Sequence, residues 1–250
     1  MSLSQILLVA IAGVVAGAIN SIAGAGSLLT FPALLAVGLP PLQANVTNSI
    51  GLIPGTMSGA WAYRSELGGQ ERRLALLMVP MAIGAVAGAL LLLVLPPRVF
   101  EVVVPVLVAL SSVLVLLQPY IARRLKAPGS SPVALTLGLL LVGVYGGYFG
   151  AAQGIMLLAV LGLFVSGTLQ RLNGFKMLIA GCGNTVAGII FVLVAHVAWP
   201  YAVVIAVASV VGGLIGAHLS LRLPDRPLRL AIAIFGLCVA GLLAFRQHLI

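Results

Sequence analysis

Two otherwise apolar segments of this chain are interrupted at matching places by the glycine-rich stretches Gly24-Ala25-Gly26-Ser27 and Gly150-Ala151-Ala152-Gln153-Gly154. Each interruption is followed by a short apolar run, residues 28–38 in the first half and residues 155–165 in the second. A helix that crosses a bilayer needs about 20 apolar residues, so neither run is long enough to span. We therefore predict that each half opens with a broken hairpin, in which a long helix is followed by a half-helix.

The composition is that of a membrane protein. Of the 250 residues, 62% are hydrophobic and 7% are charged, whereas a soluble domain has roughly 25% charged residues. We predict an all-α polytopic membrane protein that forms one transmembrane domain over residues 1–250, in contact with the lipid bilayer. The apolar runs expected to form its helices are 3–23, 28–38, 42–63, 73–95, 99–121, 132–149, 155–165, 170–195, 200–221 and 229–246.

The net charge of +9 does not indicate nucleic-acid binding, because the basic residues lie in short loops between apolar runs. Cytoplasmic loops of membrane proteins collect Lys and Arg. If four basic clusters face the cytoplasm, eleven of the thirteen basic residues lie on that side, and Arg98 and Arg246 lie opposite. Both termini are then predicted to lie on the outer side of the cell membrane, that is, of the cytoplasmic or inner membrane. The clusters are Arg64, Arg72 and Arg73; Arg123, Arg124 and Lys126; Arg171 and Lys176; and Arg222, Arg226 and Arg229.

This orientation predicts an inverted repeat. The first broken hairpin begins and ends outside, whereas the second begins and ends inside, and three spanning helices follow each. We expect residues 1–121 to form the first repeat and residues 132–250 the second. A constant offset of 130 pairs glycines of the two halves, among them Gly24 with Gly154. Paired broken segments of this kind mark the substrate site of secondary transporters.

The interruptions themselves suit an anion. Irregular backbone persists inside a bilayer where it is buried in protein or lines a wet cavity, and helix N-termini attract negative charge. We expect Ser27 to cap the first half-helix, and Gly24 and Gly26 to let a ligand approach the main chain. Gln153 and Gly154 occupy the corresponding place in the second half. The alternative is that these glycines only allow close helix packing, which we expect of glycine pairs four residues apart elsewhere.

Uncharged polar side chains gather near the same segments. Amide donors suit an oxyanion without the cost of burying another charge, although hydrogen bonding between helices is an equal alternative. Lys176, set well inside an apolar segment, either extends its amino group to the inner interface or balances a bound anion. The polar candidates are Asn20 and Ser21 before the first break, Asn45 and Asn48 after the first half-helix, and Asn173 and Asn184 in the second half.

The four acidic residues, Glu66, Glu71, Glu101 and Asp225, all lie in or beside loops. Without a carboxylate at mid-membrane, the chain is better suited to carry an anion than a cation. No nucleotide-binding loop is present to supply energy, so we expect a proton or sodium gradient, or the gradient of the anion itself, to drive transport. We expect no metal, no cofactor and no catalytic residue.

Three alternatives differ from a carrier in class. A passive anion channel and an accessory membrane subunit would have the same composition. An intramembrane serine hydrolase would use Ser27 as its nucleophile and a histidine as its base, but His196 and His218 are expected near opposite membrane faces. We therefore do not expect an enzyme. The sequence is compatible with a monomer and with a homodimer.

The stretch from Gly17 to Tyr63 contains Asn20-Ser21-Ile22-Ala23-Gly24-Ala25-Gly26-Ser27, Phe31-Pro32, Gly38 and Ala44-Asn45-Val46-Thr47-Asn48. The second half contains Tyr145-Gly146-Gly147-Tyr148-Phe149-Gly150, then Gly154 and Asn173-Gly174-Phe175-Lys176. Over nearly its whole length the chain resembles the TauE/SafE family of transmembrane sulfite exporters. The resemblance implies a carrier in the cytoplasmic membrane for sulfite, thiosulfate, sulfonates or similar anions. Ala25 and Ala152-Gln153 stand where many relatives have glycines, which bears on the particular substrate.

Overall fold

The computed structural model describes residues 2–124, 131–219 and 225–247. Lys126 and Arg222, two members of the basic clusters, and His248 lie outside the described residues. The regular structure of the described part is entirely helical. Its elements are α1 (Leu3–Ile22), α2 (Ser27–Ala36), α3 (Pro41–Ala62), the short 3-10 helix η1 (Arg64–Glu66), α4 (Glu71–Val94), α5 (Pro97–Arg124), α6 (Pro132–Tyr148), α7 (Gln153–Phe164), α8 (Leu169–Val194), α9 (Trp199–Leu219) and α10 (Asp225–Gln247).

Both predicted breaks are present, and each contains a glycine with positive φ. Gly24 has φ +75° between α1 and α2, and Gly150 has φ +77° between α6 and α7. L-residues rarely adopt this conformation, so glycine is needed where the chain turns back. The second half-helix begins two residues earlier than expected, at Gln153, because Ala152 takes a left-handed conformation with φ +57° and completes the turn.

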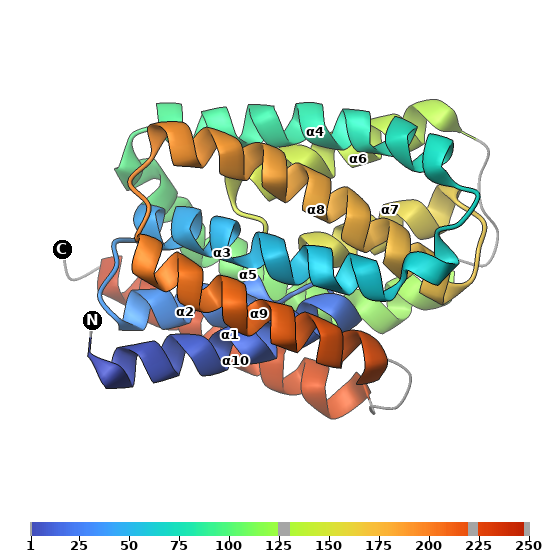
Figure 1. Cartoon of the computed structure of the whole chain (residues 1–250). Helices are drawn as coiled ribbons and strands as arrows, with labels where there is room; N and C mark the ends of the chain where they lie inside the picture. The colour runs from blue at the N-terminus through green and yellow to red at the C-terminus, as the bar shows by residue number, and fades with distance from the viewer. Residues whose placement is uncertain (1, 125–130, 220–224, 248–250) are drawn as a thin grey trace.

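The helices run between two ends of one bundle (Figure 1). At the left-hand end α1 begins and α10 finishes, whereas α3, α5, α7 and α9 finish at the right-hand end. The hairpin of α1 and α2 starts and finishes at the left, and the hairpin of α6 and α7 starts and finishes at the right. The helix ends that carry the basic clusters therefore lie together at the right-hand end.

Five helices of the described part are long and apolar enough to cross a membrane: α1, α4, α5, α8 and α9. The half-helices α2 and α7 have 10 and 12 residues, or about 15 and 18 Å at 1.5 Å per residue, and reach only part of the way. Helix α3 has 22 residues, or about 33 Å, but its first half is polar. The prediction of an all-α polytopic membrane protein is confirmed.

Small residues bring the long helices together. Helix α1 packs along α9, and α6 packs along α4. Gly17 lies against the backbone of Ser209 and Gly213, and Gly147 lies against the backbone of Ala85 and Ala89. A side chain at either glycine would collide with the partner helix. These glycines have the packing role expected of them, which is common between membrane helices.

The outside of the bundle is apolar, unlike the surface of a soluble domain. Large apolar side chains such as Leu76, Leu141 and Val207 are more than 60% exposed on the outside of the bundle. Asn48, Thr56 and other polar side chains are buried. An apolar exterior is what a bilayer requires, and the few polar side chains lie inside the bundle, away from lipid.

Candidate functional site

The two breaks touch each other through their backbones. The N–H group of Gly154 donates to the carbonyl oxygen of Gly24 over 3.1 Å. A Cβ atom built on Gly24 would lie 2.5 Å from the Cα atom of Gly154. This approach is closer than any side chain allows, so glycine is required on both sides of the contact. The residues that interrupt the two halves therefore meet in the interior of the bundle.

The helix bounds also correct the register between the halves. The half-helices begin at Ser27 and Gln153, an offset of 126, and the helices that follow begin at Pro41 and Leu169, an offset of 128. The constant offset of 130 is therefore wrong. In the predicted inverted repeat, Gly150 would be the counterpart of Gly24, because it shares the positive φ, and Gly154 is the residue that Gly24 contacts.

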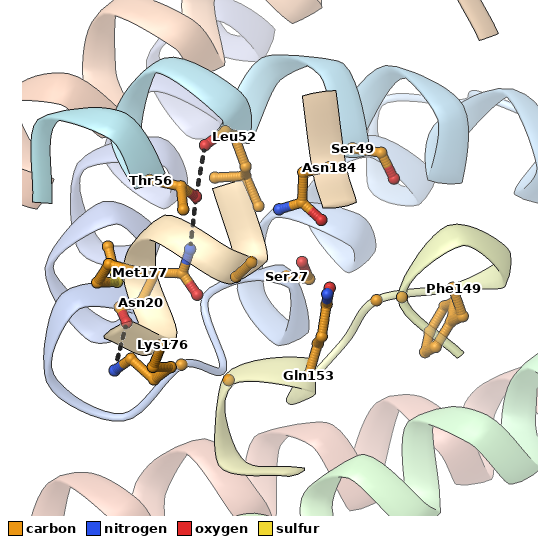
Figure 2. Close-up of a pocket in the computed structure, with 15 residues that line it drawn as sticks. Asn20, Ser27, Ser49, Leu52, Thr56, Phe149, Gln153, Lys176, Met177 and Asn184 are labelled. Atoms are coloured by element: carbon orange, nitrogen blue, oxygen red, sulfur yellow. Dashed lines mark hydrogen bonds between the residues drawn. The ribbon is translucent and has the colours of Figure 1, made fainter. Parts of the chain in front are cut away.

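A cavity of about 30 Å³ lies where the breaks meet. This volume holds one or two water molecules. Figure 2 shows that its walls come from α1, α3, α8 and both break regions. The lining residues are Asn20, Gly24, Ser27, Ser49, Leu52, Thr56, Gly146, Phe149, Gly150, Gln153, Gly154, Lys176, Met177, Ala180 and Asn184.

Three of the predicted polar residues present side chains to the same space. Gln153, Ser27 and Asn184 lie around the middle of the cavity in Figure 2. The side chain of Gln153 is 4% exposed, and its Nε2 atom has no hydrogen-bond partner among the described residues. A buried amide donor without a partner costs about 1–3 kcal/mol. Gln153 therefore offers an unused donor to whatever enters the cavity.

Lys176 lines the cavity from α8 and is 1% exposed. Its Nζ atom lies 3.4 Å from the carbonyl oxygen of Asn20 and 3.3 Å from that of Ser21. These carbonyls belong to the last turn of α1, where helical donors run out and the helix dipole is negative. The amino group does not reach the inner interface, so that alternative is wrong. The amino group is held at the first break.

Asn20 and Gly24 complete the first-half wall. The side-chain Nδ2 of Asn20 donates to the Thr56 hydroxyl over 3.1 Å, and that hydroxyl donates to the carbonyl of Leu52 over 2.9 Å. The residues predicted to form the site did not include Thr56 or Ser49. A signal for them exists: both follow the polar start of α3 and stand seven residues apart, which places them on one face of a helix with 3.6 residues per turn.

Ser21 and Gly26 do not line the cavity. The hydroxyl of Ser21 donates to the carbonyl of Gly213 over 3.0 Å and ties α1 to α9. Gly26 lies against the backbone of Ala16 on α1, where a Cβ atom has no room. For these two residues, helix packing explains the sequence.

Asn45, Asn48 and Asn173 are also buried away from the cavity. The side-chain Nδ2 of Asn45 donates to the carbonyl of Tyr148 over 3.0 Å, which joins α3 to the end of α6. Asn48 accepts a hydrogen bond from the hydroxyl of Thr30 and so holds α2 against α3. The interhelical alternative thus describes Asn45 and Asn48. Asn173 is 9% exposed, and its Oδ1 atom has no partner in the described part.

The helix starts contribute less than expected. Gly26 is the N-cap of α2, and no side-chain cap bond is made, so the prediction that Ser27 caps this helix is wrong. Several N–H groups of the first turns already have acceptors: Leu28 donates to Ala25, and Gln153 donates to Gly150. Positive charge in the cavity wall therefore comes from Lys176 and not from two open helix ends.

Groups needed for other chemistry lie elsewhere. The cavity lining contains neither a histidine nor a carboxylate, and the described residues include no group of His, Cys, Asp or Glu that could hold a metal ion. His218 is exposed and contacts the carbonyl of Leu214 on its own helix through Nδ1. Ser27 has no base within the cavity wall, as hydrolysis would require.

A multi-pass helical bundle with an apolar exterior, and two broken hairpins that meet at a polar cavity, has the architecture of a membrane transporter. Residues 9–243 match the family described as Sulfite exporter TauE/SafE, and the chain belongs to this family. Its members are transporters and not enzymes.

Similar proteins carry the same general description. The chain is 29% identical over 237 residues to the probable membrane transporter protein YfcA of Escherichia coli (strain K12), which covers 93% of this chain and 87% of that protein. It is 30% identical over 243 residues to the probable membrane transporter protein ORF9 of a Sinorhizobium species, and this match covers 95% of this chain and 92% of that protein. No solved structure matches.

Proposed function

We propose that this protein is a secondary transporter of small anions in the cell membrane, and that sulfur oxyanions such as sulfite and thiosulfate, or organosulfonates, are its substrates. One observation carries the proposal. The two broken hairpins meet at a buried cavity whose lining contains one cationic side chain, Lys176, several uncharged donors and no carboxylate. Such a lining suits a negative solute and repels none of its charge.

The donors fit the chemistry of an oxyanion. Gln153 has a free Nε2 atom, and Ser27 and Asn184 add a hydroxyl and a second amide beside it. Neutral donors bind oxygen without adding buried charge, and their hydrogen bonds strengthen where water is scarce. The amino group of Lys176 supplies the opposite charge from the edge of the same cavity.

The packing supports an inverted repeat of residues 1–121 and 132–250. Helix α1 packs on α9, and its counterpart α6 packs on α4. Similarly α3 packs on α9 and α8 on α4, while the counterpart pairs α3 with α8 and α5 with α10 contact each other. The two hairpins enter the bundle from opposite ends (Figure 1). Alternating access follows if one hairpin and its neighbours rock against the other set.

The volume of the cavity gives this motion a reason. About 30 Å³ holds one or two water molecules, whereas sulfite has four heavy atoms. The walls must therefore separate before an anion binds. Gly24 and Gly154 contact each other without side chains, so no side chains interlock at this point of contact between the two hairpins. Movement at this contact would open the cavity.

The orientation, energy source and assembly belong to the same proposal. We place the right-hand end of Figure 1 in the cytoplasm, because the exposed Arg64, Arg72 and Arg73 lie near the start of α4 at that end and positive loops stay inside. Both termini are then outside. A proton or sodium gradient, or the gradient of the anion, drives transport, and the working unit is a monomer or a homodimer.

Transport in liposomes tests the proposal. Purified protein is reconstituted, and uptake of labelled sulfite, thiosulfate and methanesulfonate is compared with uptake by empty liposomes. Saturable uptake that exchanges with unlabelled anion inside the liposome is expected of a carrier, whereas flux that never saturates indicates a channel. Uptake equal to that of empty liposomes for the whole panel, with and without proton or sodium gradients, would reject transport of these anions.

A further inference from the structure

We infer that the cavity selects singly charged oxyanions of the type R–SO₃⁻ over doubly charged ones. This inference rests on the proposed function and adds the charge and shape of the substrate to it. Its basis is the inventory of charges around the site. Lys176 is the one charged residue in the cavity lining, and it is 1% exposed. One buried cation balances one negative charge.

Among the described residues, the cavity lining contains no second cation that would balance a dianion. Arg171, the preceding basic residue of α8, lies five residues earlier, about 7.5 Å along the helix axis, and is not part of the cavity wall. Arg64, Arg72 and Arg73 are exposed near one end of the bundle. A doubly charged ion in the cavity would therefore keep one unbalanced charge out of water, which is costly in a low-dielectric interior.

Apolar side chains also line the cavity. Leu52, Phe149, Met177 and Ala180 share the lining with the polar donors. Phe149 is fixed there by edge-on contact with Phe31, with ring centroids 5.4 Å apart. Once the walls separate, an ion with charged oxygens at one end and a small apolar substituent at the other would contact both kinds of lining residue. A sulfonate has this form, with an SO₃⁻ group and an apolar carbon substituent.

A comparison of two anions separates the effect of charge on binding from the effect of shape. Methanesulfonate and thiosulfate have the same SO₃ head, and the fourth substituent is a methyl group in the first and a sulfur atom in the second. They differ by one unit of charge, and both keep their charge over the neutral pH range. Binding to the detergent-purified full chain is measured by isothermal titration, and uptake is measured in liposomes. We expect methanesulfonate to bind at least tenfold more tightly, which corresponds to about 1.4 kcal/mol.

Variants that change the charge of the cavity give the sharper test. Lys176→Gln removes the cation and should weaken binding of both ions at least tenfold, while thiosulfate, with two unbalanced charges, should still bind more weakly than methanesulfonate. Gln153→Lys adds a second cation and should move the ratio at least tenfold toward thiosulfate, and Asn184→Lys serves the same purpose if the first variant does not fold. The control is Arg171→Gln, which removes a positive charge from the same helix outside the cavity and should leave the ratio unchanged.

The outcomes distinguish this inference from the proposal beneath it. If the wild type neither binds nor transports any anion of the panel, the proposed function fails. If it transports anions but takes thiosulfate as well as methanesulfonate, transport stands and the charge inference is overturned. The charge inference is also overturned if the ratio of the two affinities is unchanged in a folded Gln153→Lys or Asn184→Lys protein. It is overturned as well if Arg171→Gln changes this ratio as much as those variants do.

Discussion

Replacing Gly154 by alanine tests whether the contact between the two breaks holds the structure together. The new Cβ atom would lie 2.5 Å from the Cα atom of Gly24 and 3.0 Å from its carbonyl oxygen. Both atoms belong to the backbone, so no side chain can rotate away. Ordinary contact begins near 3.4 Å, and the two segments must therefore separate by about 1 Å. That movement also stretches the hydrogen bond from Gly154 to Gly24.

The magnitude follows from comparable packing changes. Inserting a methyl group into a filled interior costs typically 1–3 kcal/mol, so we expect the free energy of unfolding of Gly154→Ala to fall by about that amount. Gly24→Ala has the same collision and also places alanine at φ +75°, which costs about 1–2 kcal/mol more. We expect Gly24→Ala to lose about 2–5 kcal/mol in total.

Two controls separate collision from backbone strain. Gly38 has φ +93°, but a Cβ atom there meets nothing within 4 Å, so Gly38→Ala reports strain alone, about 1–2 kcal/mol. Gly241 lies in α10 with open space around its Cβ position, and Gly241→Ala should be stabilised by about 0.5–1 kcal/mol. Unfolding is followed by tryptophan fluorescence and circular dichroism during titration with SDS in mixed micelles.

The comparison of Gly154 with Gly241 is the decisive one. Alanine favours a helix at both positions, and only the contact with Gly24 differs. If Gly154→Ala is as stable as Gly241→Ala, the two breaks do not press on each other, and the cavity between them loses its structural basis. Uptake should also fall in Gly154→Ala in proteoliposomes matched for folded protein, because the contact lies in the cavity wall.

Three further substitutions separate structural from binding roles. Asn48→Leu leaves the buried hydroxyl of Thr30 without this acceptor and should lower the free energy of unfolding by about 1–3 kcal/mol, which unfolding in SDS measures. The binding free energy of methanesulfonate should change by less than the free energy of unfolding does. Gln153→Leu removes an amide whose Nε2 has no partner, so stability should change by less than about 1 kcal/mol while methanesulfonate binding falls at least tenfold by titration calorimetry. Tyr145→Phe removes a hydroxyl that donates to the carbonyl of Ala151 over 2.6 Å, and the second break should lose about 1 kcal/mol and show faster amide hydrogen exchange. A stable Asn48→Leu, an unaltered affinity of Gln153→Leu or unchanged exchange in Tyr145→Phe would each contradict its stated role.

The sequence was sufficient for the elements and their order. Apolar length and glycine position predicted both broken hairpins, because a bilayer sets the length of a span and a positive φ requires glycine. Helix ends moved by only a few residues, and the second half-helix begins at Gln153 instead of Ile155. The left-handed Ala152 explains this shift, and no pattern in the sequence distinguishes such an alanine from one inside a helix.

Contacts between helices were much harder to predict. Seven of the proposed site residues line the cavity, whereas Ser21, Gly26, Asn45, Asn48 and Asn173 do not. Helical periodicity shows which residues share a face, but it does not show which helix that face meets. Asn45 and Asn48 therefore looked like ligands for an anion, although one holds the end of α6 and the other holds α2.

The same limit explains why Lys176 was difficult to place. In the proposed inverted repeat, the offset of 128 between the starts of α3 and α8 would make Lys176 the counterpart of Asn48. Asn48 bonds to Thr30 of its own half, whereas Lys176 reaches the end of α1 in the other half. Equivalent positions in a repeat share a backbone environment, but the length and charge of the side chain choose the partner. The basic side chain of the cavity thus comes from one half alone, and in the proposed inverted repeat any substrate would meet an asymmetric site.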